Sequence, residues 1–235
     1  MALDAEDISK HYGGVRALNG ARLSLRRGEV HALIGENGAG KSTLARILAG
    51  ATIPDSGAIR IDGQPVQIRH PRDAQRLGIG MIHQELDLFP SLSVADNILL
   101  GGGTVGRFCD LPPGRLVETL SIAQRQLVAI ARALSMNARF LLMDEPTSSL
   151  PEDAVERLFT LILNLRSQGV SIVYVSHKMD EIFRICDRIT VLRDGETIDT
   201  LEVAATSPAE VVRLMVGREV ETVTRVKRSL GAVVL

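Results

Sequence analysis

The stretch from position 35 to position 43 constrains this chain more than any other. It follows the apolar run 30–34, precedes a helix-like run at 44–49 and has the spacing G-x-x-x-x-G-K-S, with the residues Gly35, Glu36, Asn37, Gly38, Ala39, Gly40, Lys41, Ser42 and Thr43. Glycines let backbone N–H groups curl around an anion, and the helix adds the positive end of its dipole. The pattern predicts a phosphate-binding loop in which Lys41 reaches the β- and γ-phosphates of a nucleotide and Ser42 ligates Mg²⁺. The alternative is a glycine-rich turn before an ordinary helix.

Composition excludes several other classes of protein. The chain has 235 residues, of which 45% are apolar, enough for one large domain or a domain with a subdomain. A nucleic-acid partner is not expected, because the net charge is −1 and the chain has only 3% aromatic residues and no tryptophan. Residues 1–10 lack the apolar segment of a signal peptide, and no apolar run approaches about 18 residues. Cys109 and Cys186 lack metal-ligand spacing and are typical of buried thiols in a reducing compartment.

Apolar runs and turn signals predict alternating strands and helices. We expect short strands at 3–8 and 21–25 around a turn at 11–15, buried strands at 30–34, 79–82, 140–143 and 170–175, and hairpins at Asp62-Gly63 and Asp194-Gly195. Helices are expected at 71–77, 93–100, 121–136, 151–167, 179–185 and 208–216, with Ala123, Leu127, Ile130 and Leu134 as the apolar stripe of the third. The fold class is therefore α/β, with a mostly parallel core sheet and an added antiparallel β layer.

Polar residues follow three further buried strands at their carboxyl ends. Gln84 follows the strand at 79–82, Asp144 and Glu145 follow 140–143, and His177 follows 170–175. Ligands of an open α/β sheet lie beyond the carboxyl ends of its strands, so these residues are expected around one nucleotide. Asp144 has the Walker B pattern and supports Mg²⁺, Glu145 is placed to orient or deprotonate the attacking water, and His177 contacts the γ-phosphate. The alternatives are a helix N-cap for Asp144 and a purely structural histidine.

The ordered motifs resemble the ABC-transporter ATPase family over nearly the whole chain, from position 3 to 217. Residues 120–124, Leu-Ser-Ile-Ala-Gln, stand where the family has its signature, before a helix that leads to Walker B. By the same resemblance Tyr12 matches the aromatic residue that stacks on adenine, and Gln84 matches a Mg²⁺ and permease-coupling glutamine. Residues 148–151 match the D-loop, and His177 matches the H-loop. The resemblance implies a P-loop NTPase fold, ATP and Mg²⁺ as cofactors, and ATP hydrolysis.

A closer similarity is to the ATP-binding subunits of monosaccharide importers of the ribose, xylose and galactose group. It implies an ATPase that powers sugar import, bound peripherally to the cytoplasmic face of a bacterial membrane. Its partners would be a membrane permease and, indirectly, a periplasmic or extracellular sugar-binding protein. In that family two ATPase domains, in tandem or as a dimer, enclose each ATP. The signature residues Ser121, Ile122, Ala123 and Gln124 would therefore serve the partner domain's ATP.

Three features depart from the family pattern. Ile122 and Ala123 replace two glycines, and Pro151 stands at the D-loop aspartate position without a carboxylate. The helical subdomain, expected at about 86–137, is shortened at 101–114 by about one helix, roughly fifteen to twenty residues. Residues 1–220 are expected to form one ATPase domain, resembling the first of two in tandem. Residues 221–235 are expected to be a linker and a possible start of a second domain.

Two rival functions remain open. A nucleotide-binding module with impaired hydrolysis or coupling is consistent with Pro151 and the shortened subdomain. A non-transport ABC ATPase acting on DNA or ribosomes is disfavoured by the charge and the aromatic content. Simple P-loop kinases lack the signature at 120–124 and are disfavoured as well.

Overall fold

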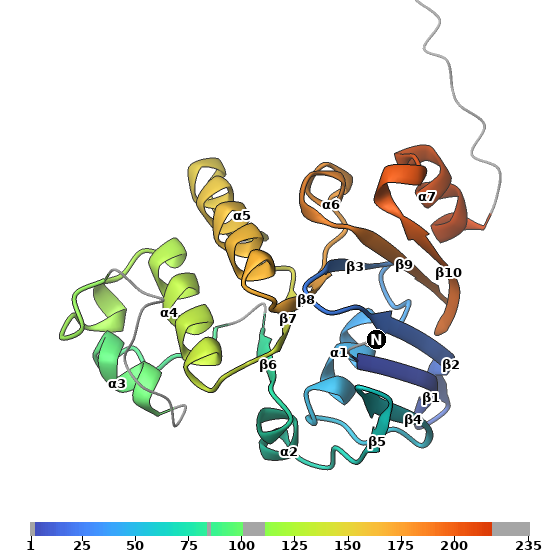
Figure 1. Ribbon diagram of the computed structural model, residues 1–235, viewed down its shortest axis with the longest axis horizontal. Helices are drawn as coiled ribbons and strands as arrows, with labels where there is room; N and C mark the ends of the chain where they lie inside the picture. The colour runs from blue at the N-terminus through green and yellow to red at the C-terminus, as the bar shows by residue number, and fades with distance from the viewer. Residues whose placement is uncertain (1–2, 84–85, 101–110, 218–235) are drawn as a thin grey trace, which may run out of the picture.

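The computed structural model describes residues 3–83, 86–100 and 111–217 and is organised around two sheets (Figure 1). The core sheet has the strand order β10-β9-β3-β8-β7-β6 and consists of β3 (Val30–Ile34), β6 (Ile79–Ile82), β7 (Phe140–Asp144), β8 (Ser171–Val175), β9 (Arg188–Arg193) and β10 (Glu196–Glu202). Each neighbouring pair from β9 to β6 is parallel, whereas β10 pairs with β9 in the antiparallel sense. The predicted mostly parallel core sheet is confirmed.

The second sheet is the antiparallel layer that the sequence predicted. Its order is β2-β1-β4-β5, formed by β1 (Leu3–Tyr12), β2 (Val15–Leu25), β4 (Ser56–Ile61) and β5 (Gln64–Val66). The predicted extents 3–8 and 21–25 were too short, because pairing continues through exposed polar residues and leaves only Gly13 and Gly14 in the turn. Register shifts along β1 bend this long ribbon, which period-two reasoning does not anticipate.

Seven α-helices in the described residues surround these sheets, at the predicted places to within three residues at either end. They are α1 (Lys41–Leu48), α2 (Pro71–Arg76), α3 (Val94–Leu99), α4 (Ile122–Ser135), α5 (Glu152–Ser167), α6 (Met179–Ile185) and α7 (Pro208–Val216), with 3-10 turns at Val117–Thr119 and Val203–Ala205. In Figure 1, α5 and α6 lie on one side of the core sheet, α1 and the antiparallel sheet lie on the other, and α3 and α4 form a lobe to the left. None of these helices is both long enough and apolar enough to cross a bilayer.

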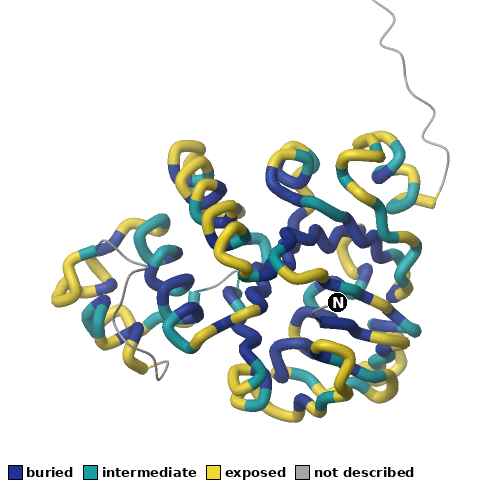
Figure 2. The backbone as a smooth tube through the Cα atoms, viewed as in Figure 1, coloured by how far each residue is buried: buried dark blue, intermediate teal, exposed yellow. Residues whose placement is uncertain are grey.

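The central strands are buried on both faces, as the dark blue tube in Figure 2 shows. Leu142 and Val173 belong to the cluster that includes α1 and the antiparallel sheet, whereas Leu141 and Ile172 belong to the cluster under α5 and α6. Because both faces are covered, these strands are mostly apolar runs in the sequence, interrupted by His31 in β3 and Ser171 in β8, and their ends were predicted to within one residue.

The α3/α4 lobe has a small core of its own, made of Val94, Ile98, Val117, Leu120, Val128 and Ala131. The predicted single apolar stripe of α4 was too narrow. Ile130 and Leu134 are buried against the core sheet, but Ala123 and Leu127 are only half-buried. The physical reason is that α4 packs on two sides, so its buried surface extends around the helix.

Candidate functional site

The glycine-rich loop joins β3 to α1 and packs directly against the antiparallel sheet. At Gly40, φ is 102°, and a Cβ would lie 2.7 Å from the carbonyl oxygen of Ala17 and 2.6 Å from Leu18 Cδ2, both on β2. At Gly35 a Cβ would collide with the carbonyl oxygen of Leu192 on β9. Glycine is therefore required at both positions for the backbone to pass between β2 and β9.

Lys41 lies at the centre of this loop. Its Nζ donates hydrogen bonds to the carbonyl oxygens of Gly35 and Glu36, at 2.8 and 3.0 Å. Burial lowers the pKa of Lys41, and the nearby negative charges of Glu145 and Asp144 act in the opposite direction. The two carboxylates at the end of β7 therefore lie close enough to the loop lysine to share one charged site with it.

Glu145 is held in an unusual backbone conformation next to His177. Its φ is 47°, and among the described non-glycine residues with positive φ it alone is neither aspartate nor asparagine. Its N–H donates to the carbonyl oxygen of Val175 at 2.9 Å, so the β7–β8 ladder continues one residue beyond the strands. Oε1 of Glu145 lies 3.1 Å from Nδ1 of His177. The sheet thus brings together the ends of β7 and β8, as predicted.

Oxygen donors for a hard cation flank the same place. Ser42 and Thr43 lie in the first turn of α1, which begins after Gly40. Asp144 is half-buried at the end of β7. Among the described residues no three His, Cys, Asp or Glu side chains group as a metal cage. This donor set fits Mg²⁺, which commonly takes one or two protein oxygens and fills its remaining positions with phosphate and water.

Two predicted ATP contacts come from outside the loop. Tyr12 lies at the tip of the β1–β2 hairpin, 47% exposed, with Lys10 Nζ 5.6 Å from its ring centroid. The contact of Ala17 and Leu18 with Gly40 places this hairpin beside the loop, so Tyr12 is within the same region of the fold. Gln84 lies outside the described residues, although β6, which precedes it, is the neighbour of β7 in the sheet.

The signature residues lie in the other lobe. Ser121 is the N-cap of α4, and its hydroxyl and the Gln124 side chain form a reciprocal capping box. Ile122 is 49% exposed and Ala123 is half-buried. Figure 1 shows the α3/α4 lobe apart from α1, so one chain does not bring the signature to its own phosphate loop.

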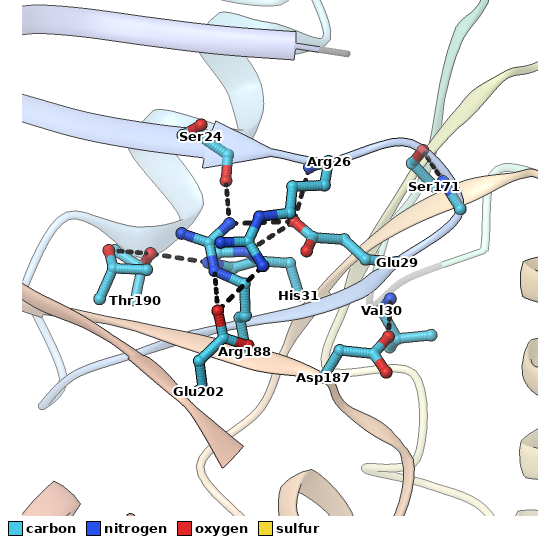
Figure 3. A network of polar contacts seen from close by, with 12 residues as sticks. Ser24, Arg26, Glu29, Val30, His31, Ser171, Asp187, Arg188, Thr190 and Glu202 are labelled. Atoms are coloured by element: carbon cyan, nitrogen blue, oxygen red, sulfur yellow. Dashed lines mark hydrogen bonds and ion pairs between the residues drawn. The ribbon is translucent and has the colours of Figure 1, made fainter. Parts of the chain in front are cut away.

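A second polar cluster lies at the opposite, amino-terminal edge of the core sheet (Figure 3). Buried His31 has Nδ1 3.1 Å from Glu29 Oε1 and Nε2 2.7 Å from Thr190 Oγ1, and Arg188 pairs with Glu29 and Glu202. Burial lowers the pKa of His31 although Glu29 acts to raise it. Both ring nitrogens have partners, and the cluster ties β3 to β9 and β10 at a distance from the phosphate loop.

Sequence reasoning missed two buried polar residues, one beside the site and one in the α3/α4 lobe. Glu181 on α6 accepts hydrogen bonds from the segments that carry Glu145 and His177, and Gln126 on α4 is 6% exposed. An acidic residue in the first turn of a helix and a glutamine in an amphipathic helix are both ordinary, so the sequence carried no signal for either. Of the two cysteines, Cys186 is buried as expected, and Cys109 lies outside the described residues.

The glycine loop on a helix N-terminus, its central lysine and the adjacent carboxylates define a P-loop nucleotide-binding domain. Residues 18–148 match the family model described as ABC transporter, and the chain belongs to that family. It is 49% identical to the "Putative ribose/galactose/methyl galactoside import ATP-binding protein 2" of Burkholderia cenocepacia (strain HI2424) over 93% of this chain and 47% of that protein. The chain thus spans about half the length of the curated relatives it matches.

Solved structures have the same fold. A nucleotide-free ATP-binding cassette from an ABC transporter superposes with a TM-score of 0.79 at 23% identity, covering 92% of this chain and 95% of that one. A dimeric ATP-binding cassette in a post-hydrolysis state, bound to ADP and Pi, gives a TM-score of 0.72 at 25% identity, covering 86% of this chain and 98% of that one. The predicted fold class is confirmed.

Proposed function

We propose that this chain is an ATP-binding and ATP-hydrolysing part of a transporter that imports a monosaccharide. The observation that carries the hydrolytic assignment is the convergence of Lys41, Glu145 and His177 at adjoining strand ends. The import assignment is supported by the printed name of the relative that is 49% identical. Since the chain spans about half of that relative, the activity named for the longer protein comes to this chain only as a proposal.

The proposed roles follow from the chemistry of each residue. Residues 35–43 hold the phosphates through backbone N–H groups and the Lys41 ammonium, while Tyr12 stacks on adenine. Ser42, Asp144 and Gln84 are the proposed Mg²⁺ contacts, and the bound cation neutralises charge on the phosphates. Glu145 orients and deprotonates the attacking water, and His177, within hydrogen-bond distance of its carboxylate, stabilises the γ-phosphate.

The remaining ATP contacts of the site come from a second ATPase domain, either in tandem or in a dimer. The position of Ser121 at the tip of α4, in the lobe apart from the phosphate loop, supports this, as does the dimeric cassette among the similar structures. The hydroxyl of Ser121 and the N-terminal N–H groups of α4 suit a phosphate that the partner domain holds. Residues 1–220 would be one such domain, with 86–137 as its signature subdomain.

The proposed membrane partner is a permease, reached from the cytoplasmic face, with a sugar-binding protein as an indirect partner. Besides Ile122, the described part of the α3/α4 lobe exposes four large apolar side chains, Phe89, Leu99, Leu100 and Leu116, each more than 40% accessible to solvent. A groove of about 260 Å³ lies between β6 and α4, lined in part by Met81, His83 and Leu86. Exposed apolar surface of this kind is typical of a protein interface. Replacing Phe89 and Leu99 together by serine is expected to abolish co-purification with the permease and to leave ATP binding intact.

The test of hydrolysis compares the parent chain with Glu145→Gln at high protein concentration, so that a dimer is populated. The parent is expected to hydrolyse Mg-ATP, while Glu145→Gln is expected to bind it without turnover. Glu152→Gln, an exposed carboxylate in the first turn of α5, is the matched control and should retain the parent's rate. If neither the parent nor Glu145→Gln binds ATP with Mg²⁺, the proposed function is wrong.

One observation favours a second candidate, a module that binds ATP without coupling it to transport. Pro151 is the N-cap of α5, and its hydrocarbon side chain offers no carboxylate for contact with a partner domain. ATP binding without turnover in the parent chain, even with a permease present, would establish this alternative.

A further inference from the structure

A buried carboxylate, Glu181, lies behind the proposed catalytic pair Glu145 and His177. It is 7% exposed, in the first turn of α6. Its Oε2 accepts hydrogen bonds from Tyr174 Oη at 2.7 Å and from Thr147 Oγ1 at 2.9 Å. Oε2 also accepts from Ser176 Oγ at 3.3 Å, and Oε1 lies 3.1 Å from Lys178 Nζ. Both carboxylate oxygens of Glu181 therefore have partners within the fold.

The donors to Glu181 come from the two segments that carry the pair. Thr147 stands two residues after Glu145, and Ser176 stands immediately before His177. Lys178 adds a second connection, because its Nζ donates to the carbonyl oxygen and the hydroxyl of Thr147 at 3.4 and 3.3 Å. Glu181 is thus the common acceptor that joins the turn after β7 to the turn after β8.

The three hydroxyl donors to Glu181 are buried. Tyr174, Thr147 and Ser176 are at most 3% exposed. Burial and the neighbouring Glu181 both raise the pKa of the Tyr174 hydroxyl, which therefore stays a donor. Hydrogen bonds to a buried carboxylate are stronger than those between neutral groups, and removal of the acceptor leaves its donors unpaired.

The backbone at Glu145 needs such support. A non-glycine residue with φ of 47° persists only where the surrounding structure over-determines it. The hydrogen bond from the Glu145 N–H to Val175 fixes one side of this turn, and the contact between Thr147 and Glu181 fixes the other.

We propose that Glu181 is a positioning residue that sets the distance and orientation of the Glu145–His177 pair for ATP hydrolysis. The proposal rests on the proposed function, since the pair's role in hydrolysis does. Glu181 acts through its hydrogen bonds with Thr147 and Ser176, and not by contact with the nucleotide. A merely structural role for Glu181 would change the stability of the fold and leave the chemical step of the remaining folded enzyme unchanged.

The experiment compares the parent with Glu181→Gln, which keeps the side chain's size and removes its charge. We expect kcat for Mg-ATP to fall by about 10- to 100-fold, because a small misplacement of reacting groups has an effect of that order. The KM for ATP is expected to stay within about twofold, since phosphate contacts made by the loop are untouched. Asp180→Asn is the matched control. It removes a neighbouring, exposed carboxylate in the same helical turn and should retain the parent's kcat.

A double-mutant cycle with His177→Ala separates positioning from stability. If Glu181 acts through the pair, Glu181→Gln has a smaller effect on kcat once His177 is gone, since only the positioning of Glu145 then remains to be lost. Thr147→Val keeps the carboxylate and removes one donor. Should Glu181→Gln fail to fold, Thr147→Val is expected to show the same loss in kcat at unchanged KM, to a smaller degree. Additive losses in the cycle, or an unchanged kcat in a folded Glu181→Gln, would overturn the proposal.

A crystal structure of Glu181→Gln gives a readout that does not depend on activity. The separation of Glu145 Oε1 and His177 Nδ1 is expected to exceed hydrogen-bond distance, compared with 3.1 Å in the parent. If the parent does not hydrolyse ATP, the proposed function fails, and this separation still decides whether Glu181 positions the pair. If the parent hydrolyses ATP and the separation is unchanged in the variant, the positioning role alone is wrong.

Discussion

Replacing Gln126 by methionine is expected to stabilise the domain. The Nε2 atom of Gln126 is buried and, among the described residues, has no hydrogen-bond partner. The side chain borders a groove of about 270 Å³ and a small void of about 20 Å³ that is lined mainly by apolar residues such as Leu127, Leu150 and Leu158. An unpaired buried amide costs about 1–3 kcal/mol, while a volume-conserving swap usually costs less than about 1.5 kcal/mol.

The difference is a net gain of about 1 kcal/mol, which for a domain of this size raises Tm by about 2–4 °C. Thermal unfolding followed by circular dichroism measures it. Gln168→Met, at the exposed C-cap of α5, is the control and should change stability by less than about 0.5 kcal/mol. A lower Tm for Gln126→Met would refute the reasoning, because it would mean that water or another group satisfies the amide in solution.

Three further outcomes follow from the geometry. Gly40→Ala is expected to abolish binding of a fluorescent ATP analogue, since its Cβ would lie 2.7 Å from a backbone oxygen of β2. Gly38→Ala is the control and should weaken binding far less, because a Cβ at position 38 would have no atom within 4 Å. Ile162→Ala, at a fully buried position, should lower the free energy of unfolding in urea by about 2–5 kcal/mol, while Leu163→Ala, 39% exposed, should cost much less. Burial lowers the pKa of His31 below its ordinary value of 6.5, so the unfolded chain takes up a proton at His31 before the folded chain does. Stability is therefore fully present above about pH 6.5 and falls as the pH drops through that value; His31→Gln should flatten the fall between about pH 7.5 and 5.5 in chemical denaturation.

The sequence predicted the fold best where both faces of a strand are buried. β7 and β8 are mostly apolar runs bounded by polar residues, and their ends were predicted to within one residue. β1 and β2 were predicted too short. The residues near their shared turn are exposed and the pairing is bulged, so the strands continue where the sequence no longer alternates between apolar and polar residues. Backbone pairing with a neighbouring strand is a tertiary event that local composition does not record.

Parallel topology explains why part of the site was predictable. The carboxyl ends of neighbouring parallel strands meet at one edge, so Asp144, Glu145 and His177 were expected beside the loop before any contact was known. Glu181 was not predictable, because its partner Thr147 lies 34 residues away and an acid in the first turn of a helix has a local explanation. The roles assigned to all of the site residues, the signature residues and Gln84 included, stay predictions.

Two unfavourable features lie in segments to which the proposed function gives a role, the turn after β7 and helix α4. Glu145 has a backbone conformation that costs about 1–3 kcal/mol, and the buried amide nitrogen of Gln126 has no partner among the described residues. At the opposite edge of the sheet, His31 has a partner for each ring nitrogen. Natural sequences rarely lie at their stability optimum, so such features persist although stabilising substitutions are easy to find. Substitutions that relieve features of this kind commonly cost activity where a site needs flexibility or a strained conformation. A Gln126→Met variant that gains stability should therefore lose turnover.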